Sequence, residues 1–483
     1  MVGGISAQVL ETIAAPHAES GALFVSQAIL AFGVAALLFT SLHTRRSGLW
    51  WTGAIIHVGA GVALPFAADI VTFFIAWEFV TIGAAMILAA EPNGRTLLKW
   101  YLPWQLFAAA MLLSAFALEF AETAAYGIPD SGLQAGLVPA GIALGIKSAV
   151  LPAHIWLINT YTKVRPTSAV VLAAVATKIG VFGIYRLIPG HYVLEIVGAT
   201  LAVLAVLYAL RQSRLRPFLA YHIISQVGFM IAGVGSANRV AQLGGLYHLG
   251  NHVMYKGLLF MVVAILIPLA GTADMYSLRG AGRKSVALTL SAFAGALSIS
   301  GVPPFNGYVS KSVLHTSLES QTAVTLLTIA GIGTAISFTK FLWYGFLKPG
   351  PTTDSPRTAR VRVHIVVGAL AILTLSMGLF PTVFFPALPP ESRIRFSSLL
   401  AGQVNPAIGA VLFFLLYRPL LRILNTVLPG SHRPRAFLRL CTNRCLDAMQ
   451  QLHTGNTQRY LGWTVAGILV LWVSIILATT AIR

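Results

Sequence analysis

The sequence predicts an all-α polytopic membrane protein with about fourteen spanning helices. Apolar residues make up 57% of the 483-residue chain and charged residues only 10%, whereas soluble proteins carry about 25% charged residues. Apolar runs of about 20 residues, the length that crosses a bilayer as a helix, recur along the whole chain. The first residues lack a basic region, so we expect no cleavable signal peptide.

The fourteen spans follow one another with short polar links, the shortest of which separates the second span from the third. Their expected ranges are 22–42, 50–67, 69–90, 101–119, 134–158, 167–188, 193–210, 218–235, 241–269, 286–316, 323–347, 363–381, 403–420 and 460–481.

The basic residues predict the orientation. If the N-terminus lies outside and the chain alternates, 23 of the 33 Lys and Arg residues fall at the inner face and four at the outer face. Such an excess is typical of the inner loops of membrane proteins. It accounts for the net charge of +19 as an orientation signal rather than a nucleic-acid surface. Anionic lipid at the inner face would add to it.

Two spans contain prolines that should interrupt them. Pro152 follows Lys147 in the fifth span, and Pro303 and Pro304 precede Lys311 in the tenth. Proline removes a backbone hydrogen bond and clashes with the preceding turn, so each helix should bend or split. Backbone groups freed at membrane depth must face protein or water, and broken helices therefore mark ion or substrate sites. The five-span separation of the breaks suggests an internal five-helix repeat.

The inner segment 422–459 is long for a loop. Within 435–452, apolar and basic residues alternate at helical spacing, which predicts an amphipathic helix at the inner membrane surface or along a partner. A solvated linker with a short helix is the alternative. Cys441 and Cys445 lie in this segment without a nearby ligand set, so we expect no metal site.

A row of ionisable residues lies in the ninth span. His248, His252 and Lys256 are spaced by four residues, so they share one helix face over roughly 12 Å. A charge at the bilayer centre costs on the order of 2.5–3.5 kcal/mol. We therefore expect the row to face a hydrated seam and exchange protons. Alternatively, the two histidines bond to carbonyls and the lysine extends to the membrane surface.

Four further ionisable residues lie in apolar segments: Glu78, Lys147, Lys178 and Lys311. An intramembrane acid and base are most stable as a pair, so we expect Glu78 to meet Lys147 across a helix interface. A lysine whose carboxylate partner can move away could gain and lose a proton, as a relay requires. The alternatives are a static salt bridge for this pair and a surface-seeking Lys178.

Other polar residues have structural interpretations. Arg186 and Lys340 lie near span ends and are expected to be anchors, and His154 could bond the carbonyls of the broken fifth span. The sequence has no Fe–S cysteine set, dinucleotide fingerprint or phosphate loop. We therefore expect no cofactor, no metal and no catalytic residue, and an ion gradient or partner subunits must drive any transport.

Several motifs occur together in order. They are WEF around Glu78, K-x-x-x-x-P-x-H-x-W from Lys147, KIGVFGIYR from Lys178, H-x-x-x-H-x-x-x-K from His248, and GVPPFNGYVSK from Gly301. This combination resembles the proton-conducting antiporter family, which includes antiporter-like membrane subunits of respiratory complex I and the A and D subunits of Mrp-type cation/proton antiporters. Relatives occur in membrane-bound hydrogenases.

The resemblance implies two inverted five-helix repeats and a hydrophilic axis along the bilayer middle. It implies that Glu78 and Lys147 are the coupling pair, that Lys178, His248, His252 and Lys256 are relay positions, and that Lys311 is the exit-side lysine. Two leading spans usual in the family are not expected here, so Glu78 falls in the third span. Ile158 to Thr160 replaces a family Pro-x-Ala, which bears on the shape of that loop.

These observations divide the chain into an N-terminal segment with the first span (1–49), a first repeat (50–190), a second repeat (191–348) and C-terminal spans (349–483). We expect a proton-translocating, non-enzymatic component of a multi-subunit complex in a bacterial plasma membrane, with Na⁺ or K⁺ as candidate coupled ions. The alternatives are a component of a redox-driven pump, a proton channel of an inorganic-carbon uptake complex, and a non-conducting scaffold.

Overall fold

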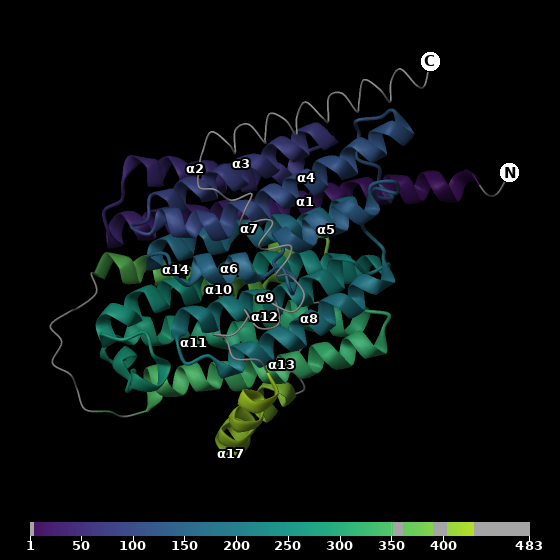
Figure 1. Ribbon diagram of the computed structural model, residues 1–483. Coiled ribbons are helices and arrows are strands. Elements are labelled where there is room, and N and C mark those ends of the chain that lie inside the picture. Colours follow the sequence, from purple (N-terminus) through teal and green to yellow (C-terminus); the bar gives the residue numbers. More distant parts are fainter. Residues whose placement is uncertain (1–3, 349, 351–360, 390–402, 429–483) are drawn as a thin grey trace. The chain divides into compact units, whose positions relative to one another are not determined.

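The computed structural model describes residues 4–348, 350, 361–389 and 403–428, with side chains from residue 20 onward. The chain divides into two units, Met1–Arg418 and Pro419–Arg483. All regular elements in the described ranges are helices, and the long helices from α1 to α14 run side by side (Figure 1). They are α1 (Gly4–His43), α2 (Gly48–Ala63), η1 (Leu64–Phe66), α3 (Ile70–Ala89), α4 (Gly94–Thr123), α5 (Leu137–Lys147), α6 (Ile155–Tyr161), α7 (Pro166–Leu187), α8 (Tyr192–Arg211), α9 (Leu215–Val234), α10 (Arg239–Ala270), η2 (Met275–Ser277), η3 (Ala281–Lys284), α11 (Val286–Ser300), α12 (Asn306–Ser317), α13 (Gln321–Leu342), η4 (Trp343–Leu347), α14 (Val361–Leu379), α15 (Pro381–Phe384) and α17 (Val404–Val427).

Eleven helices in the described ranges are long and apolar enough to cross a membrane, which confirms the polytopic all-α class. Two further predicted spans are each divided into two shorter helices, α5 with α6 and α11 with α12. The predicted span 460–481 and the predicted amphipathic helix 435–452 lie outside the described residues. The thirteenth predicted span differs slightly, because α17 continues to Val427, beyond the expected end at 420.

The first helices of the two divided spans, α5 and α11, end with the same backbone geometry. A residue with a left-handed backbone follows the first helix of each span: Ala149 after the cap Ser148 of α5, with φ of 59°, and Gly301, the cap of α11, with φ of 76°. The next amide reaches back to close the turn, from Val150 to Gly145 O and from Val302 to Leu297 O, each 2.9 Å. This is the hydrogen-bond pattern of a Schellman motif. Pro152, Pro303 and Pro304 lie just beyond, where the chain no longer needs helical amides.

Two pairs of neighbouring helices, α2 with α3 and α8 with α9, bring their backbones into close contact at glycine residues. A Cβ at Gly83 of α3 would lie 2.7 Å from Gly53 O of α2, and one at Gly228 of α9 would lie 2.5 Å from Gly198 O of α8. Glycine permits this approach of two backbones because it has no side chain. The 145-residue offset is the same for both members (198 − 53 and 228 − 83), as expected for an internal repeat.

The links between helices repeat as well. An isolated antiparallel β-bridge joins Asp69 in the α2–α3 link to Gly127 in the segment after α4. A second one joins Arg214 in the α8–α9 link to Asp274 in the segment after α10. Helix contacts follow the same order: α2, α3, α4, α5/α6 and α7 contact one another as α8, α9, α10, α11/α12 and α13 do. We infer a duplication of five spans, each copy with a broken fourth member.

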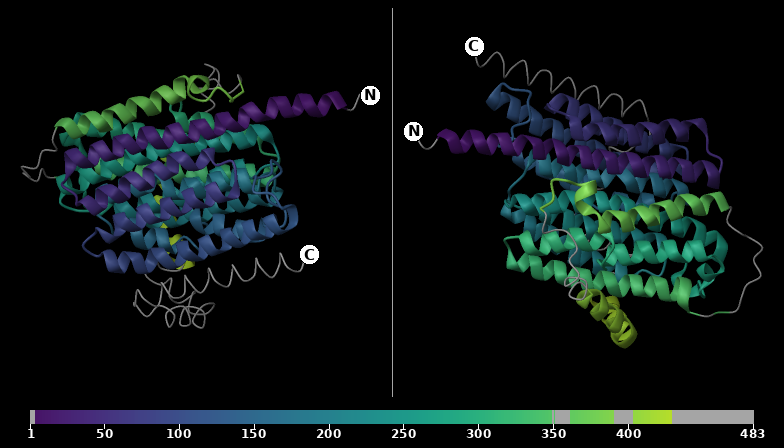
Figure 2. Two further views of the ribbon diagram at one scale, coloured as in Figure 1. Left: turned by 90° about the horizontal axis from the view of Figure 1, so that it is seen from above. Right: turned by 180° about the vertical axis from the view of Figure 1, so that it is seen from behind.

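Further helices cover this duplicated core. Helix α10 contacts α7, α9, α11 and α12, so it lies at the centre of the first unit. Helices α1 and α14 lie side by side against α10 (Figure 2). The α10 span is thus removed from lipid along most of its length, and polar residues on it can face protein or water.

Candidate ion-translocation site

Helix α10 carries His248, His252 and Lys256, all fully buried. Asn238 begins the helix by accepting the amides of Val240 and Ala241 through its side chain, as N-cap residues do. The helix then continues without interruption past the row, so the four-residue spacing keeps the three side chains on one face.

His248 is held between three helices. Its Nδ1 lies 2.8 Å from Ser310 Oγ of α12, and its Nε2 lies 3.3 Å from Gln226 Oε1 of α9. Tyr255 OH lies 3.4 Å from the same Nε2. Both ring nitrogens therefore face polar side chains, rather than the backbone carbonyls of the alternative interpretation.

His252 and Lys256 have unpaired polar atoms. Neither ring nitrogen of His252, nor Lys256 Nζ, has a hydrogen-bond partner among the described residues. Lys256 Nζ lies 6.0 Å from the centroid of Phe260 and 5.9 Å from that of Phe338, inside the protein rather than at its surface. Buried polar groups without partners are costly, and three of them in one place fit a seam that admits water.

Lys178 of α7 extends the row. Its Nζ donates to Ala173 O at 2.5 Å and to Thr177 Oγ1 at 3.3 Å, and the side chain is fully buried. Its charge acts on both His252 and Lys256. The alternative of a Lys178 that extends to the membrane surface is therefore not what the structure shows.

Lys147 lies at the last turn of α5, against α3. Its Nζ donates to Thr81 Oγ1 at 2.7 Å and lies 4.5 Å from the Trp77 ring centroid. The expected ion pair with Glu78 is not among the ion pairs of the described residues. Glu78 is half-buried, is within electrostatic range of Lys147, and has one carboxylate oxygen without a partner. A neutral acceptor on the same helix has replaced the carboxylate.

Lys311 closes the other end of the row. Its Nζ donates at 2.6 Å to Ile299 O, a carbonyl freed where α11 ends, and lies 4.8 Å from the Phe229 ring centroid. In the first break, Ile146 O, one residue before the position that matches Ile299, accepts from Trp156 Nε1 at 2.8 Å.

Three ionisable residues on the core helices were not predicted as site residues. His57 of α2 contacts Val80 O at 2.8 Å and leaves Nε2 unpaired, and His222 of α9 leaves both ring nitrogens unpaired. Lys340 was expected to be an anchor because it lies near a span end, but its side chain is fully buried. Each is an ionisable residue in an apolar span, which is the signal that could have identified it.

The remaining expected structural residues are accounted for. Arg186 is half-buried near the end of α7 and pairs with the exposed Asp130 at 3.4 Å, as an anchor would. His154 Nδ1 lies 3.1 Å from Pro152 O in the first break. The described residues contain no cluster of His, Cys, Asp or Glu that could hold a metal, and Cys441 and Cys445 lie outside them.

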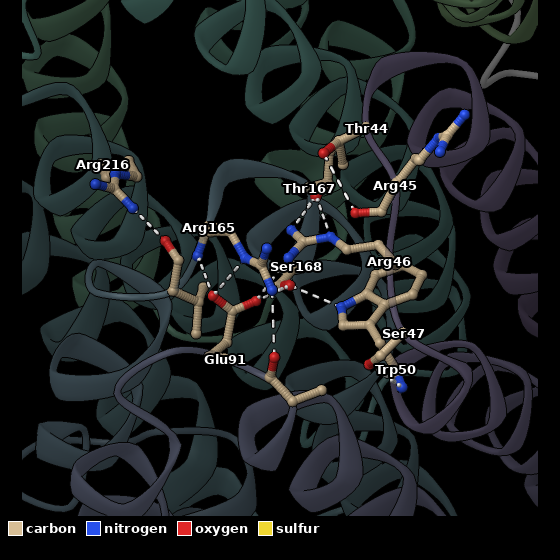
Figure 3. A network of polar contacts seen from close by, with 12 residues as sticks. Thr44, Arg45, Arg46, Ser47, Trp50, Glu91, Arg165, Thr167, Ser168 and Arg216 are labelled. Atoms are coloured by element: carbon tan, nitrogen blue, oxygen red, sulfur yellow. Dashed lines mark hydrogen bonds and ion pairs between the residues drawn. The ribbon is translucent and has the colours of Figure 1, made fainter.

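A second polar cluster surrounds Glu91 at the end of α3 (Figure 3). The carboxylate accepts from Arg46 Nη1 at 3.1 Å, from Arg165 N at 2.9 Å and from Ser168 Oγ at 2.6 Å. Trp50 Nε1 donates to the same Ser168 Oγ at 2.8 Å. Burial lowers the pKa of Arg46 to about 10, although Glu91 opposes this shift, so the guanidinium stays charged at neutral pH.

A buried acid from a different helix, Glu195 of α8, plays the same part in the second repeat. Glu195 Oε2 accepts from Ser320 N at 3.0 Å, directly before α13, as Glu91 accepts from Arg165 N directly before α7. A carboxylate at a helix N-terminus satisfies free amides and interacts favourably with the helix dipole. Each repeat thus fixes the start of its last helix with a buried acid, a feature that sequence reasoning missed.

Residues 67–337 match the model of the transmembrane family described as NADH:quinone oxidoreductase/Mrp antiporter. Among curated relatives, the chain is 24% identical to the D component of the Na⁺/H⁺ antiporter of Alkalihalophilus pseudofirmus, covering 72% of this chain and 76% of the relative. It is 26% identical to the A component of the Na⁺/H⁺ antiporter of Bacillus subtilis, covering 76% of this chain and 52% of the relative. The matched part of the chain therefore spans about half the length of that second relative.

The fold also resembles a solved structure, the Mrp complex from Dietzia sp. DQ12-45-1b. The TM-score is 0.77 at 23% identity, covering 96% of this chain and 56% of that chain. The motifs that suggested the family from sequence, from Glu78 to Lys311, lie within the matched residues. Because the family match spans more than half of the chain, this protein belongs to the NADH:quinone oxidoreductase/Mrp antiporter transmembrane family.

Proposed function

We propose that this chain is the proton-translocating part of a multi-subunit membrane complex that exchanges a cation for protons. The observation that carries the proposal is the row of buried ionisable groups on α7, α10 and α12. Lys178 acts electrostatically on His252 and Lys256, and Lys311 acts on His248. Such groups at membrane depth are expensive and mark ion pathways.

The geometry at Lys147 supports a switch. Glu78 and Thr81 lie three residues apart on α3, so they share one face of the helix. Lys147 donates to the neutral Thr81. A movement of its flexible side chain toward Glu78 would stabilise the ammonium, and the return to Thr81 would favour release of the proton. The released proton passes to Lys178, along the α10 row and on to Lys311, with water bridging the gaps.

The setting of this transport is also a proposal. The predicted orientation puts the N-terminus outside a bacterial plasma membrane, with repeats over 50–190 and 191–348. The partners are other membrane subunits of the complex and the surrounding lipid, and the coupled ion is Na⁺ or K⁺. The names of the relatives, which are components of Na⁺/H⁺ antiporters, support partners and ions of this kind.

The test uses the whole complex in inverted membrane vesicles from a host that lacks other antiporters. Respiration acidifies the interior of these vesicles, and addition of Na⁺ or K⁺ should then raise the interior pH when the wild-type chain is present, as a fluorescent pH probe reports. Lys147→Ala and Glu78→Ala should each abolish this response while the complex still assembles. An unchanged response in both variants would refute the proposal.

The family description includes NADH:quinone oxidoreductase, so a redox-driven pump is the second candidate. The two functions differ in what drives the proton. A redox pump should acidify vesicles only with an electron donor, and proteins with Fe–S clusters or flavin should purify with it. A cation/proton antiporter should respond to an imposed Na⁺ or K⁺ gradient when no donor is present.

A further inference from the structure

Two ionisable residues outside the central row lie next to it in the second repeat. His222, on the second turn of α9, is fully buried and has no hydrogen-bond partner for either ring nitrogen among the described residues. Lys340, on the last turn of α13, is also fully buried. Neither takes part in the pathway from Lys147 to Lys311 proposed above.

Two phenyl rings pack against His222, one shared with Lys256 and the other shared with Lys340. The centroid of the Phe338 ring lies 4.8 Å from the centroid of the His222 ring and 5.9 Å from Lys256 Nζ. The centroid of the Phe218 ring lies 4.8 Å from that of the His222 ring and 5.5 Å from Lys340 Nζ. His222 therefore shares one aromatic neighbour with each of the two lysines.

Lys340 reaches the end of α8. Its Nζ donates to Leu210 O and to Gln212 O, each at 2.9 Å. These carbonyls lie at the start of the link between α8 and α9, where Ser213 is half-buried and Arg214 is exposed. In the orientation proposed above, this link lies at the inner face. The carbonyls that bind Lys340 are thus close along the chain to residues in contact with solvent, although the lysine side chain is buried.

We infer that His222 and Lys340 form a branch of the proton pathway that connects Lys256 with the inner face. Lys340 takes a proton from water at the α8–α9 link onto its neutral amine and passes it to one ring nitrogen of His222. The ring releases its other proton toward the neutral amine of Lys256, so each step moves one proton and changes no bond order outside the ring. This inference rests on the proposed function.

The groups that face His222 are consistent with this role. Three lysines act on its ring electrostatically: Lys256 of α10, Lys340 of α13 and Lys311 of α12. Its charged neighbours are therefore lysines on three different helices, each of which can carry a proton. Tyr417 OH, which donates to Leu210 O at 3.2 Å, lies at the inner end of the branch.

A purely structural role for Lys340 is the competing interpretation, since a basic side chain that binds the last carbonyls of a helix stabilises its end. Lys340→Arg separates the two roles. Arginine keeps the charge and the donors but does not give up a proton in proteins. His222→Gln is the second variant, because an amide can hydrogen-bond but cannot carry a proton through a ring.

The experiment measures the initial rate of cation-driven pH change with the assembled complex in vesicles, with Lys147→Ala as reference. Both Lys340→Arg and His222→Gln should slow transport about tenfold or more, as expected when a proton-transfer group is lost, while native gels show intact complex. Wild-type rates in both variants, together with an inactive Lys147→Ala, would overturn this inference and leave the proposed function standing.

Two other outcomes are informative. An active Lys147→Ala variant would refute the proposed function itself. If Lys340→Arg assembles and transports normally while Lys340→Met fails to assemble, the lysine holds the end of α8 and the branch does not exist. Loss of assembly in both Lys340→Arg and His222→Gln would likewise assign the pair to the fold and overturn the inference.

Discussion

Lys147 Nζ donates a 2.7 Å hydrogen bond to Thr81 Oγ1, one helical turn from Glu78 on the same face of α3. The buried ammonium therefore has one neutral acceptor and one charged acceptor within the same stretch of helix. The proposed transport cycle uses these as the two positions of a switch, and this makes a prediction for Thr81 as well as for the two charged residues.

Thr81→Val removes the neutral acceptor with little change in side-chain volume. A hydrogen bond to a charged group is worth about 1.5–3 kcal/mol, so Lys147 should remain with Glu78 and the initial rate of cation-driven pH change should fall about tenfold. Thr81→Ser keeps the hydroxyl and should transport at the wild-type rate. Equal rates for the Val and Ser variants would show that Thr81 is not part of the switch.

The two helix breaks predict opposite effects for exchanging alanine and glycine. Ala149 has a left-handed backbone with φ of 59°, which costs an L-residue roughly 1–2 kcal/mol. Ala149→Gly should therefore raise the unfolding temperature of the complex. Gly301→Ala should lower it, because φ there is 76° and the new Cβ would also lie 3.1 Å from Lys311 Cδ.

Thermal unfolding of the purified complex, followed by loss of the native band on gels, measures both changes. The two positions occupy corresponding places in the repeats, so each variant is the control for the other. A lower unfolding temperature for Ala149→Gly would contradict the interpretation that the first break is strained at this residue.

The glycines at which α2 meets α3 and α8 meets α9 should not tolerate a side chain. A Cβ at Gly83 would lie 2.5 Å from His57 N and 2.7 Å from Gly53 O, both backbone atoms that cannot rotate away. Overpacking of this kind costs about 1–3 kcal/mol, so Gly83→Ala should lower the unfolding temperature by several degrees. Gly59→Ala, in open space on α2, is the matched control and should not lower the unfolding temperature, because alanine favours a helix more than glycine does.

Much of the fold was predictable because its signals are local. The length of an apolar run determines whether a helix can cross a bilayer, and proline interrupts a helix wherever it falls. The described spans and both breaks therefore lie where the sequence indicates, and the order of the motifs identified the family before any geometry was known.

The partners within the site were less predictable, because they depend on packing. The sequence indicated that Lys147 needs an acceptor but not that Thr81 would accept its hydrogen bond in place of Glu78. The position of Lys340 close to a span end predicts an anchor, whereas the packing of α13 on α8 directs its side chain at carbonyls inside the protein. His222 is the only ionisable histidine or lysine in α9, and only the folding of the chain brings it within electrostatic range of Lys256.

Glu91 should contribute strongly to the stability of the assembled complex. Arg46, whose side chain is fully buried, pairs with it at 3.1 Å, and breaking a buried pair costs about 3–5 kcal/mol because the remaining charge is left uncompensated. Glu91→Gln should therefore reduce the amount of assembled complex severalfold on native gels.

The matched control for Glu91 is another acid that pairs with an arginine. Asp130 lies 3.4 Å from Arg186, but its side chain is fully exposed, and exposed pairs contribute only about 0–1 kcal/mol. Asp130→Asn should assemble like the wild type. If Glu91→Gln did so too, the cluster around Glu91 would not be holding the start of α7.

The most direct test of the central claim is proton flux through the purified complex in proteoliposomes under an imposed Na⁺ or K⁺ gradient. Lys256→Gln removes the buried base at the centre of the row, and Lys163→Gln removes an exposed lysine. Proton transfer along the row predicts that flux disappears in the first variant and is unchanged in the second. Wild-type flux through an assembled Lys256→Gln complex would contradict it.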